Sequence, residues 1–203
     1  MSTSRSTDVA DGSPNLGRLR DFVLGMTRLV DRHGADEPRL LDAGEKLLRG
    51  LVAHDDWLPA EFAAPSPESY RQYLLYCDPL ERFSVVSFVW MPGHRTPIHD
   101  HTVWGLVGVM RGAELCEEFS TALKKTASHE VNPGYVDRVS PSIGDIHVVS
   151  NAGTNDAVSI HVYGANIGAV RRHTFDPESG KPREFVSGYH NRTVPNLWDR
   201  SKD

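Results

Sequence analysis

Cysteine and long hydrophobic runs are scarce in this sequence of 203 residues. The two cysteines, Cys77 and Cys116, cannot build a disulfide framework, so we interpret both as small buried hydrophobic residues and expect a reducing, cytoplasmic location. No apolar run approaches the roughly 20 residues that cross a bilayer. The polar start, residues 1–15, lacks the order of a signal peptide, and we therefore expect no membrane partner.

An excess of basic charge is also missing. The chain has 22 Lys and Arg residues against 27 Asp and Glu residues, which gives a formal net charge of −5. Nucleic-acid-binding surfaces usually carry a clustered basic excess, so we expect no nucleic-acid partner. Hydrophobic residues make up 39% of the chain and charged residues 24%, which is ordinary for a soluble globular protein. The composition leaves the oligomeric state open.

Two segments near the N-terminus have the spacing of amphipathic helices. In residues 16–33 and 37–54, hydrophobic side chains recur every three or four positions, and Gly34 follows the first segment as a stop. The preceding residues, 1–15, are polar and predict a disordered lead. A proline-rich stretch after the second segment indicates a connector.

From residue 70 onward, the pattern changes to short β-branched and aromatic runs separated by Gly, Pro, Asn and Asp. Many short strands of this kind predict a sandwich or barrel. The runs are 70–77, 83–91, 103–110, 113–119, 135–139, 146–149, 158–163 and 170–175. Residues 177–203 are predicted to form an irregular tail. We expect a single mainly β domain over 16–203, with helices in 16–54 covering one end of a β-barrel that spans about 70–175.

Three histidines have the spacing of metal ligands. His99 and His101 are two residues apart, so on an extended segment their side chains project to the same face. His147 stands at the start of another predicted strand. The pattern favours a shared metal ion over three unrelated structural histidines. Asp100, between the first two, should point to the opposite face and support the site without binding the ion.

The segments around these histidines resemble the two motifs of the cupin superfamily. Gly93, His99, His101 and Gly112 match the first motif, and Gly144, His147 and Asn151 match the second. Pro141 is displaced by one position, and Gly105 stands where the usual cupin glutamate would be. The resemblance implies a cupin double-stranded β-helix (jelly-roll) barrel with N-terminal α-helices. Three neutral imidazoles without a carboxylate would leave the full charge of a divalent ion and favour an anionic ligand such as a thiolate.

A second pattern lies in the predicted strand 158–163. Ser159, His161 and Tyr163 alternate with apolar residues and would share one face of the strand. A strand with one face in solvent produces the same alternation. The three side chains could equally form a hydrogen-bonded relay. A hydrolase is not indicated, because a serine nucleophile normally lies on a tight turn.

Taken together, the two patterns resemble the thiol dioxygenases, the cysteine dioxygenase family within the cupins, over about residues 70–175. The resemblance implies Fe(II) as cofactor, a small thiol and O2 as partners, and transfer of both oxygen atoms to sulfur. Tyr163 would then face the oxygen or the substrate, and His161 and Ser159 would orient it from behind.

Alignment with this family bears on the substrate. Gln72 falls where the cysteine-specific members have an arginine, and no cysteine stands at their cross-linking position shortly after His101. In this respect the chain resembles the bacterial members that prefer 3-mercaptopropionate, and we expect no cysteine–tyrosine cross-link. Because Gln72 is neutral, a substrate carboxylate needs a cation from elsewhere. Of the adjacent Arg171 and Arg172, the similarity favours Arg172.

The resemblance therefore implies a non-haem Fe(II) thiol dioxygenase that oxidises 3-mercaptopropionate to its sulfinate, with L-cysteine as the alternative substrate. Two other hypotheses stay open. One is a different metal-dependent cupin enzyme, which the Ser159, His161 and Tyr163 pattern argues against. The other is a non-catalytic small-ligand-binding cupin, for which the sequence shows no DNA-binding helix pair as an output.

Overall fold

The computed structural model describes residues 13–199, so most of the predicted disordered lead and the last four residues lie outside the described part. Two helices open this part, α1 (Leu16–His33) and α2 (Glu37–Val52). Both end within two residues of the bounds that the hydrophobic periodicity predicts. Asp36 caps α2 by accepting a hydrogen bond from the Arg39 backbone N–H. In residues 13–199, no helix combines the length and the hydrophobicity that crossing a membrane would require.

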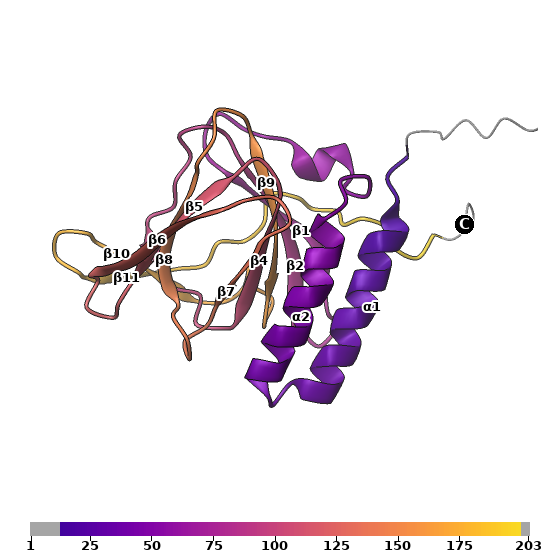
Figure 1. The fold of residues 1–203 in the computed structure, drawn as a ribbon, viewed down its shortest axis with the longest axis horizontal. Helices are drawn as coiled ribbons and strands as arrows, with labels where there is room; N and C mark the ends of the chain where they lie inside the picture. Colours follow the sequence, from indigo (N-terminus) through magenta and orange to yellow (C-terminus); the bar gives the residue numbers. More distant parts are fainter. Residues whose placement is uncertain (1–12, 200–203) are drawn as a thin grey trace, which may run out of the picture.

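The remaining elements form two antiparallel sheets that face each other (Figure 1). The five-stranded sheet has the order β1-β2-β9-β4-β7, and the six-stranded sheet has the order β11-β10-β3-β8-β5-β6. The sequence prediction of a mainly β barrel with N-terminal helices is thereby confirmed. A short 3-10 helix, η1 (Ala60–Ala63), precedes the strands, which are β1 (Arg71–Cys77), β2 (Ser84–Trp90), β3 (Ile98–His99), β4 (Gly105–Arg111), β5 (Glu114–Phe119), β6 (Lys125–Val131), β7 (Val136–Val139), β8 (Ile146–Asn151), β9 (Ala157–Tyr163), β10 (Arg172–Phe175) and β11 (Pro182–Phe185).

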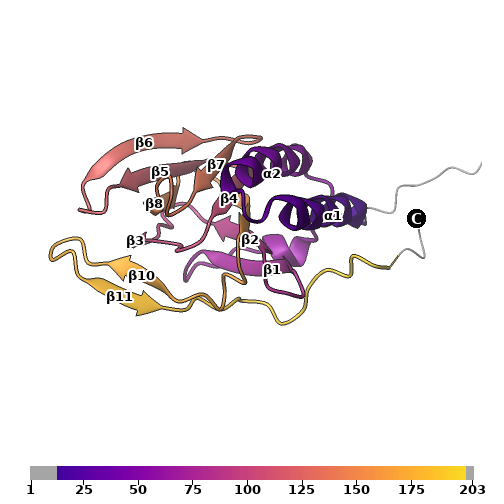
Figure 2. The same cartoon turned by 90° about the horizontal axis from the view of Figure 1, so that it is seen from below.

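Three strands were not predicted. β3 is only two residues long, and β6 is a mostly exposed edge strand with few hydrophobic residues, so neither has a recognisable pattern. β11 lies inside the tail 177–203 that we predicted to be irregular, and this part of the prediction is wrong. β11 pairs with β10 in a hairpin whose register joins Arg172 to Phe185. Figure 2 shows this hairpin at the margin of the six-stranded sheet.

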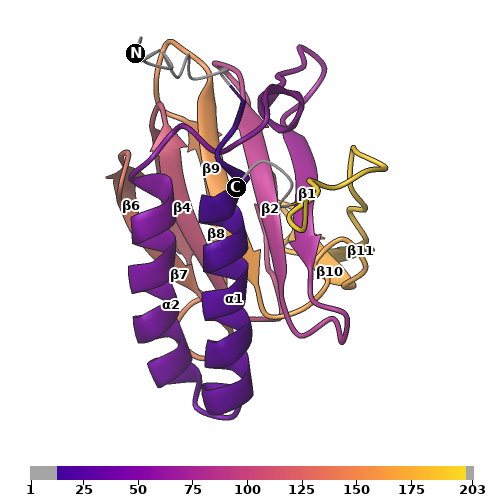
Figure 3. The same cartoon turned by 90° about the vertical axis from the view of Figure 1, so that its right-hand side faces the viewer.

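The two helices cover the outer face of the five-stranded sheet, and not one end of the barrel as we expected (Figure 3). A Cβ added to Gly108 of β4 would lie 3.0 Å from Leu48 and from Val52 of α2. The reason lies in β9. Its even-numbered residues form one face of the strand, are all apolar, and belong to the same core cluster as the buried residues of the helices. Burying this second apolar face of the sheet requires a further layer.

The opposite face of the five-stranded sheet looks into the barrel. There, Phe88 and Trp90 of β2 and Tyr163 of β9 belong to a separate core cluster. The C-terminal residues after β11 run along β1, the edge strand of this sheet, where His190 N–H donates to the Gln72 carbonyl. The side chain of Asn191 also bonds both backbone groups of Leu74. The tail therefore lies along the edge of the barrel that carries Gln72, one of the predicted site residues.

Candidate metal centre

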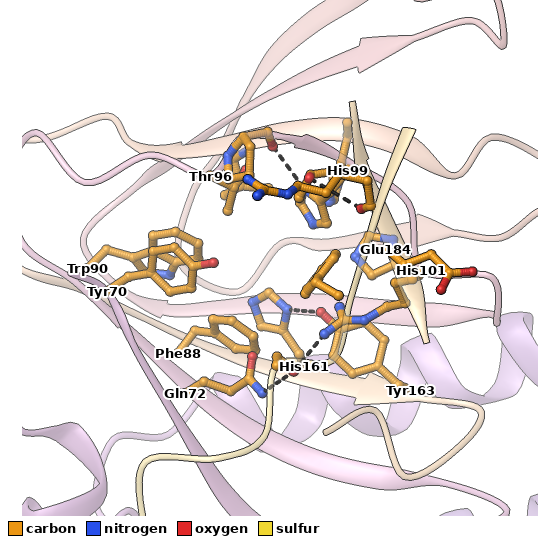
Figure 4. Close-up of a pocket in the computed structure, with 18 residues that line it drawn as sticks. Tyr70, Gln72, Phe88, Trp90, Thr96, His99, His101, His161, Tyr163 and Glu184 are labelled. Carbon is orange, nitrogen blue, oxygen red and sulfur yellow. Dashed lines mark hydrogen bonds between the residues drawn. The ribbon is translucent and has the colours of Figure 1, made fainter. Parts of the chain in front are cut away.

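His99, His101 and His147 meet inside the barrel. His99 of β3 is the direct register partner of His147 of β8, and His101 follows β3 by two residues. The three ring centroids are 4.8 to 4.9 Å apart, and each side chain is buried. Their potential ligand atoms all lie within 4.8 Å of one another, so the group can hold a metal ion. Figure 4 shows His99 and His101 directed into the cavity described below.

Each of the three rings has a partner behind its Nδ1 atom. The Nδ1 of His99 lies 3.1 Å from the Pro97 carbonyl, and that of His101 lies 3.0 Å from a carboxylate oxygen of Asp145. The Nδ1 of His147 lies 3.6 Å from the sulfur of Cys116. A carbonyl and a carboxylate can only accept, so Nδ1 carries the proton in the first two rings. In His99 and His101 the free lone pair is then on Nε2, and the partner of Nδ1 fixes the orientation of the ring.

Burial keeps two of these histidines, His99 and His147, neutral. Desolvation, together with repulsion from His101, lowers the pKa of His99 to about 3. Desolvation and the neighbouring histidines also place the pKa of His147 well below its usual range. At neutral pH these imidazoles therefore keep unprotonated nitrogen atoms, which is what a divalent transition metal requires of its ligands.

Among residues 13–199, no carboxylate belongs to the histidine cluster. Asp100 faces away, as expected, and its carboxylate binds the backbone N–H and the Nδ1 of His173 at 2.7 and 2.9 Å. At Gly105, the position of the usual cupin glutamate, an added Cβ would lie 2.8 Å from Val139 and 2.9 Å from the ring of Tyr163. A longer side chain at this position would therefore displace Tyr163.

Ser159, His161 and Tyr163 form a hydrogen-bonded relay along β9. The Ser159 hydroxyl lies 2.8 Å from Nε2 of His161, and Nδ1 of His161 lies 2.8 Å from the Tyr163 hydroxyl. All three are buried, which rules out the alternative of a solvent-facing strand. The Tyr163 ring stacks on His101 at 5.3 Å, so one end of the relay adjoins the histidine cluster.

Burial also determines the charge of the relay. Desolvation lowers the pKa of His161 well below its usual range. It also raises the pKa of Tyr163 far above that of a free phenol, although the nearby Arg172 opposes this shift. At neutral pH both groups are therefore uncharged, and Tyr163 keeps its hydroxyl proton.

A cavity of about 440 Å³ connects the histidine cluster, Tyr163 and the predicted carboxylate-binding residues. Arg172 is buried and stacks on Phe185, with its guanidinium carbon 4.7 Å from the ring centre. One terminal nitrogen donates to Ser187 at 2.7 Å. Within residues 13–199, the Nε of Arg172 has no hydrogen-bond partner. The adjacent Arg171 is exposed and pairs with Glu184 at 3.6 Å.

Gln72 also lines the cavity, but its amide group is engaged. Its amide nitrogen donates to the Ser187 hydroxyl at 3.0 Å and to the Gly188 carbonyl at 2.5 Å. Both amide hydrogens are therefore used to hold the C-terminal segment, and the amide oxygen is the group left for a ligand. In this arrangement Gln72 supports Ser187, which in turn contacts Arg172.

Several residues that build the site were missed in the sequence. Phe185 and Ser187 line the cavity from the tail that we predicted to be irregular. A partial signal was present, because Asp176 and Gly180 bracket a tight turn, with Gly180 at φ 68°. The partners Asp145 and Cys116 had no such signal, since each lies more than 30 residues from the histidine that it contacts.

A second group of metal-binding residue types, Cys116, His129 and Asp137, lies behind His147. Two features make it a poor metal site. His129 and Asp137 are already joined by a hydrogen bond of 2.6 Å, and burial near acidic groups raises the pKa of the Cys116 thiol far above its usual range. As predicted, Cys116 is buried, whereas Cys77 is half-buried, and both are free thiols.

The chain is similar to several solved structures at low sequence identity. No model of a known protein family matches the sequence. An uncharacterized conserved protein with a double-stranded β-helix domain from Klebsiella pneumoniae is 14% identical, with a TM-score of 0.45 over 64% of this chain and 97% of that chain. An RmlC-like cupin family protein from Methanocaldococcus jannaschii is 12% identical, with a TM-score of 0.40 over 50% and 85%.

Oxalate oxidase is 21% identical, with a TM-score of 0.42, and the match covers 49% of this chain and 53% of the oxidase. The chain thus spans about half of the length of that enzyme. The likeness to these three proteins assigns no activity to this chain.

Proposed function

We propose that this protein is a mononuclear non-haem Fe(II) thiol dioxygenase that oxidises 3-mercaptopropionate to its sulfinate. The observation that carries the proposal is the meeting of three groups in one cavity: a buried cluster of three histidines, the hydroxyl of Tyr163 at the end of its relay, and the guanidinium of Arg172. A general metal-binding pocket would need only the first of these groups.

The histidine cluster fits iron in this role. His99, His101 and His147 would hold Fe(II) through three neutral nitrogen atoms, so the ion would keep its full positive charge. Bound there, Fe(II) would supply a binding position for the thiolate and for O2 and the oxidation of the sulfur. The absence of a carboxylate near Gly105 favours an anionic substrate over a neutral one.

The role of the relay follows from its geometry. Tyr163 lies beside His101 and keeps its proton at neutral pH, so its hydroxyl can donate a hydrogen bond into the cavity. His161 is wedged between Phe88, whose ring centre is 4.1 Å away, and the Ser159 hydroxyl, so its ring has a fixed orientation. Preorganised donors of this kind stabilise charge that develops on a reacting group.

Arg172 provides the recognition of the carboxylate. Its buried Nε points to no partner among residues 13–199, and an unpaired buried N–H is costly unless a ligand satisfies it. Burial lowers the pKa of Arg172, but an arginine keeps its charge in this range. A carboxylate would satisfy both the free N–H and the charge.

The choice between 3-mercaptopropionate and L-cysteine rests on the amino group. An ammonium beside the carboxylate of cysteine would enter the region of Arg172, which forms no ion pair with any described residue. Repulsion between the two cations in a buried site disfavours cysteine. L-cysteine remains the alternative substrate, because the amide oxygen of Gln72 could accept from its ammonium.

The proposal is tested by oxygen uptake of protein shown to hold one iron per chain, with the two thiols supplied in parallel and the product identified by mass. We expect uptake matched by sulfinate, with a higher kcat/KM for 3-mercaptopropionate. Comparable values for both thiols would overturn the substrate preference. No uptake with either thiol would overturn the reaction class and favour another metal-dependent chemistry of this barrel.

A further inference from the structure

A buried carboxyl lies at the far end of the relay from the histidine cluster. Glu114 of β5 is 1% exposed, and its Oε1 atom has no hydrogen-bond partner within residues 13–199. The Ser159 hydroxyl and the Trp90 indole adjoin this carboxyl, where as donors they favour its ionised form. Trp90 also donates to the Ser159 oxygen at 3.2 Å. Glu114 therefore adjoins the Ser159 end of the relay that leads to Tyr163.

We propose that Glu114 is a positioning residue whose protonation state sets the direction of every hydrogen bond in the relay. The inference deepens the proposed function, because it concerns whether Tyr163 can donate into the cavity. Two features carry it: the burial of a carboxyl with an unsatisfied oxygen beside Ser159, and the two hydrogen bonds of 2.8 Å that link Ser159 through His161 to Tyr163.

In the protonated form, Glu114 donates to the Ser159 oxygen. The Ser159 hydroxyl then donates to Nε2 of His161, since a hydroxyl has a single proton. His161 is neutral, so its own proton must be on Nδ1, from which it donates to the Tyr163 oxygen. The hydroxyl proton of Tyr163 is then free to point into the cavity.

In the ionised form, all directions reverse. The Ser159 hydroxyl donates to the carboxylate and accepts from Nε2–H of His161. Nδ1 of His161 is then an acceptor and takes the hydroxyl proton of Tyr163. The Tyr163 oxygen presents only lone pairs to the cavity and can no longer stabilise negative charge there.

The surroundings of Glu114 allow both forms near neutral pH. Burial raises the pKa of Glu114 to about 7, and the Asp137 carboxylate of β7 contributes to the rise. On its own strand, Cys116 keeps its thiol proton, because burial raises the pKa of that group as well. The register partners of Glu114 are Asn151 on β8 and Val131 on β6, and neither titrates.

The test reads the tautomer of His161 in the metal-free protein. Long-range ¹H–¹⁵N NMR distinguishes Nδ1–H from Nε2–H, and the variant His161→Gln identifies the signals. We expect Nδ1–H at about pH 5.5 and Nε2–H at about pH 8.5, with a midpoint near the pKa of Glu114. A single tautomer across this range in the native protein would overturn the inference, whether or not any variant folds.

Two variants sharpen the result. Glu114→Gln carries a permanent amide donor and should hold His161 as Nδ1–H at every pH. Glu117→Gln is the matched control, since this glutamate lies on the same strand but pairs with Lys125 and Arg95. The switch should persist in the control. Its persistence in Glu114→Gln would show that another group drives it and would contradict the inference.

The tautomer measurement needs neither iron nor thiol, so it can succeed even if the proposed reaction is wrong. If thiol oxidation is observed, the native kcat/KM should fall roughly twentyfold between about pH 6.5 and 8.5 relative to Glu114→Gln. A matching pH profile in the two proteins would show that the direction of the relay does not affect catalysis.

Discussion

The histidine cluster and the relay are both buried triplets of polar side chains, but they are built in opposite ways. The cluster draws its members from β3, the segment after it and β8, and their free nitrogen atoms converge on one point. The relay takes all its members from β9 and forms a line. A convergent set can hold an ion, whereas a line can only orient its last member. Changes in the two triplets should therefore have separable effects.

The largest effect is expected from His147→Ala. Loss of one of three ligands should weaken iron binding by more than about a hundredfold, because the remaining two imidazoles leave the ion under-coordinated. Metal content after dialysis measures this. His54→Ala, at an exposed position outside the cluster, is the control and should retain its iron. Full iron retention by His147→Ala would contradict the convergent arrangement.

Tyr163→Phe should separate the relay from the cluster. This variant keeps the ring that stacks on His101, so iron binding should be unchanged, while thiol oxidation falls roughly a hundredfold through the lost donor. Iron content and kcat are the measurements. Tyr73→Phe removes a hydroxyl that contacts Ala64 outside the cavity and should behave as the native protein. Equal kcat in Tyr163→Phe and the native protein would argue against the thiol dioxygenase.

Arg172→Lys should affect substrate binding and neither triplet. The variant keeps a charge but loses the Nε donor, and such charged hydrogen bonds contribute about 1.5 to 3 kcal/mol, or roughly ten- to a hundredfold in KM for 3-mercaptopropionate. Steady-state kinetics measure KM and kcat separately. Arg171→Lys, at the exposed neighbour, is the control. A fall in kcat at unchanged KM would assign Arg172 a different role.

The smallest effect concerns the support of the cluster. Asp145 accepts hydrogen bonds from the backbone N–H and the Nδ1 of His101. Burial opposes the ionisation of Asp145, but these contacts outweigh it, so the pKa of Asp145 lies below the usual range. Asp145→Asn should weaken iron binding about tenfold. Competition with a chelator measures the change, with exposed Asp156→Asn as the control. A loss as large as that of His147→Ala would mean that Asp145 itself binds the ion.

Local spacing was sufficient to predict the relay and two of the three histidines of the cluster. His99 and His101, like Ser159, His161 and Tyr163, obey the two-residue period of an extended chain, so their shared faces follow from the sequence. The sequence does not show which face of β9 points into the barrel. Only the packing of α1 and α2 on the other face of this strand shows it.

The supporting residues could not be predicted for a different reason. Glu114 lies on β5 and adjoins Ser159 of β9 in the facing sheet, whereas Asp145 lies just before β8 and contacts His101 just after the neighbouring β3. Both contacts join residues far apart in the sequence. Gln72 illustrates a related limit. The alignment identified the position, but only the structure shows that Ser187 and Gly188 occupy its amide hydrogens.

The most direct test of the central claim is the origin of the oxygen atoms in the product. Iron-loaded protein is given 3-mercaptopropionate under ¹⁸O2, and the product is analysed by mass spectrometry. A thiol dioxygenase predicts a sulfinate in which both oxygen atoms are ¹⁸O. A sulfinate with one labelled atom or none, or a disulfide as the only product, would contradict the account.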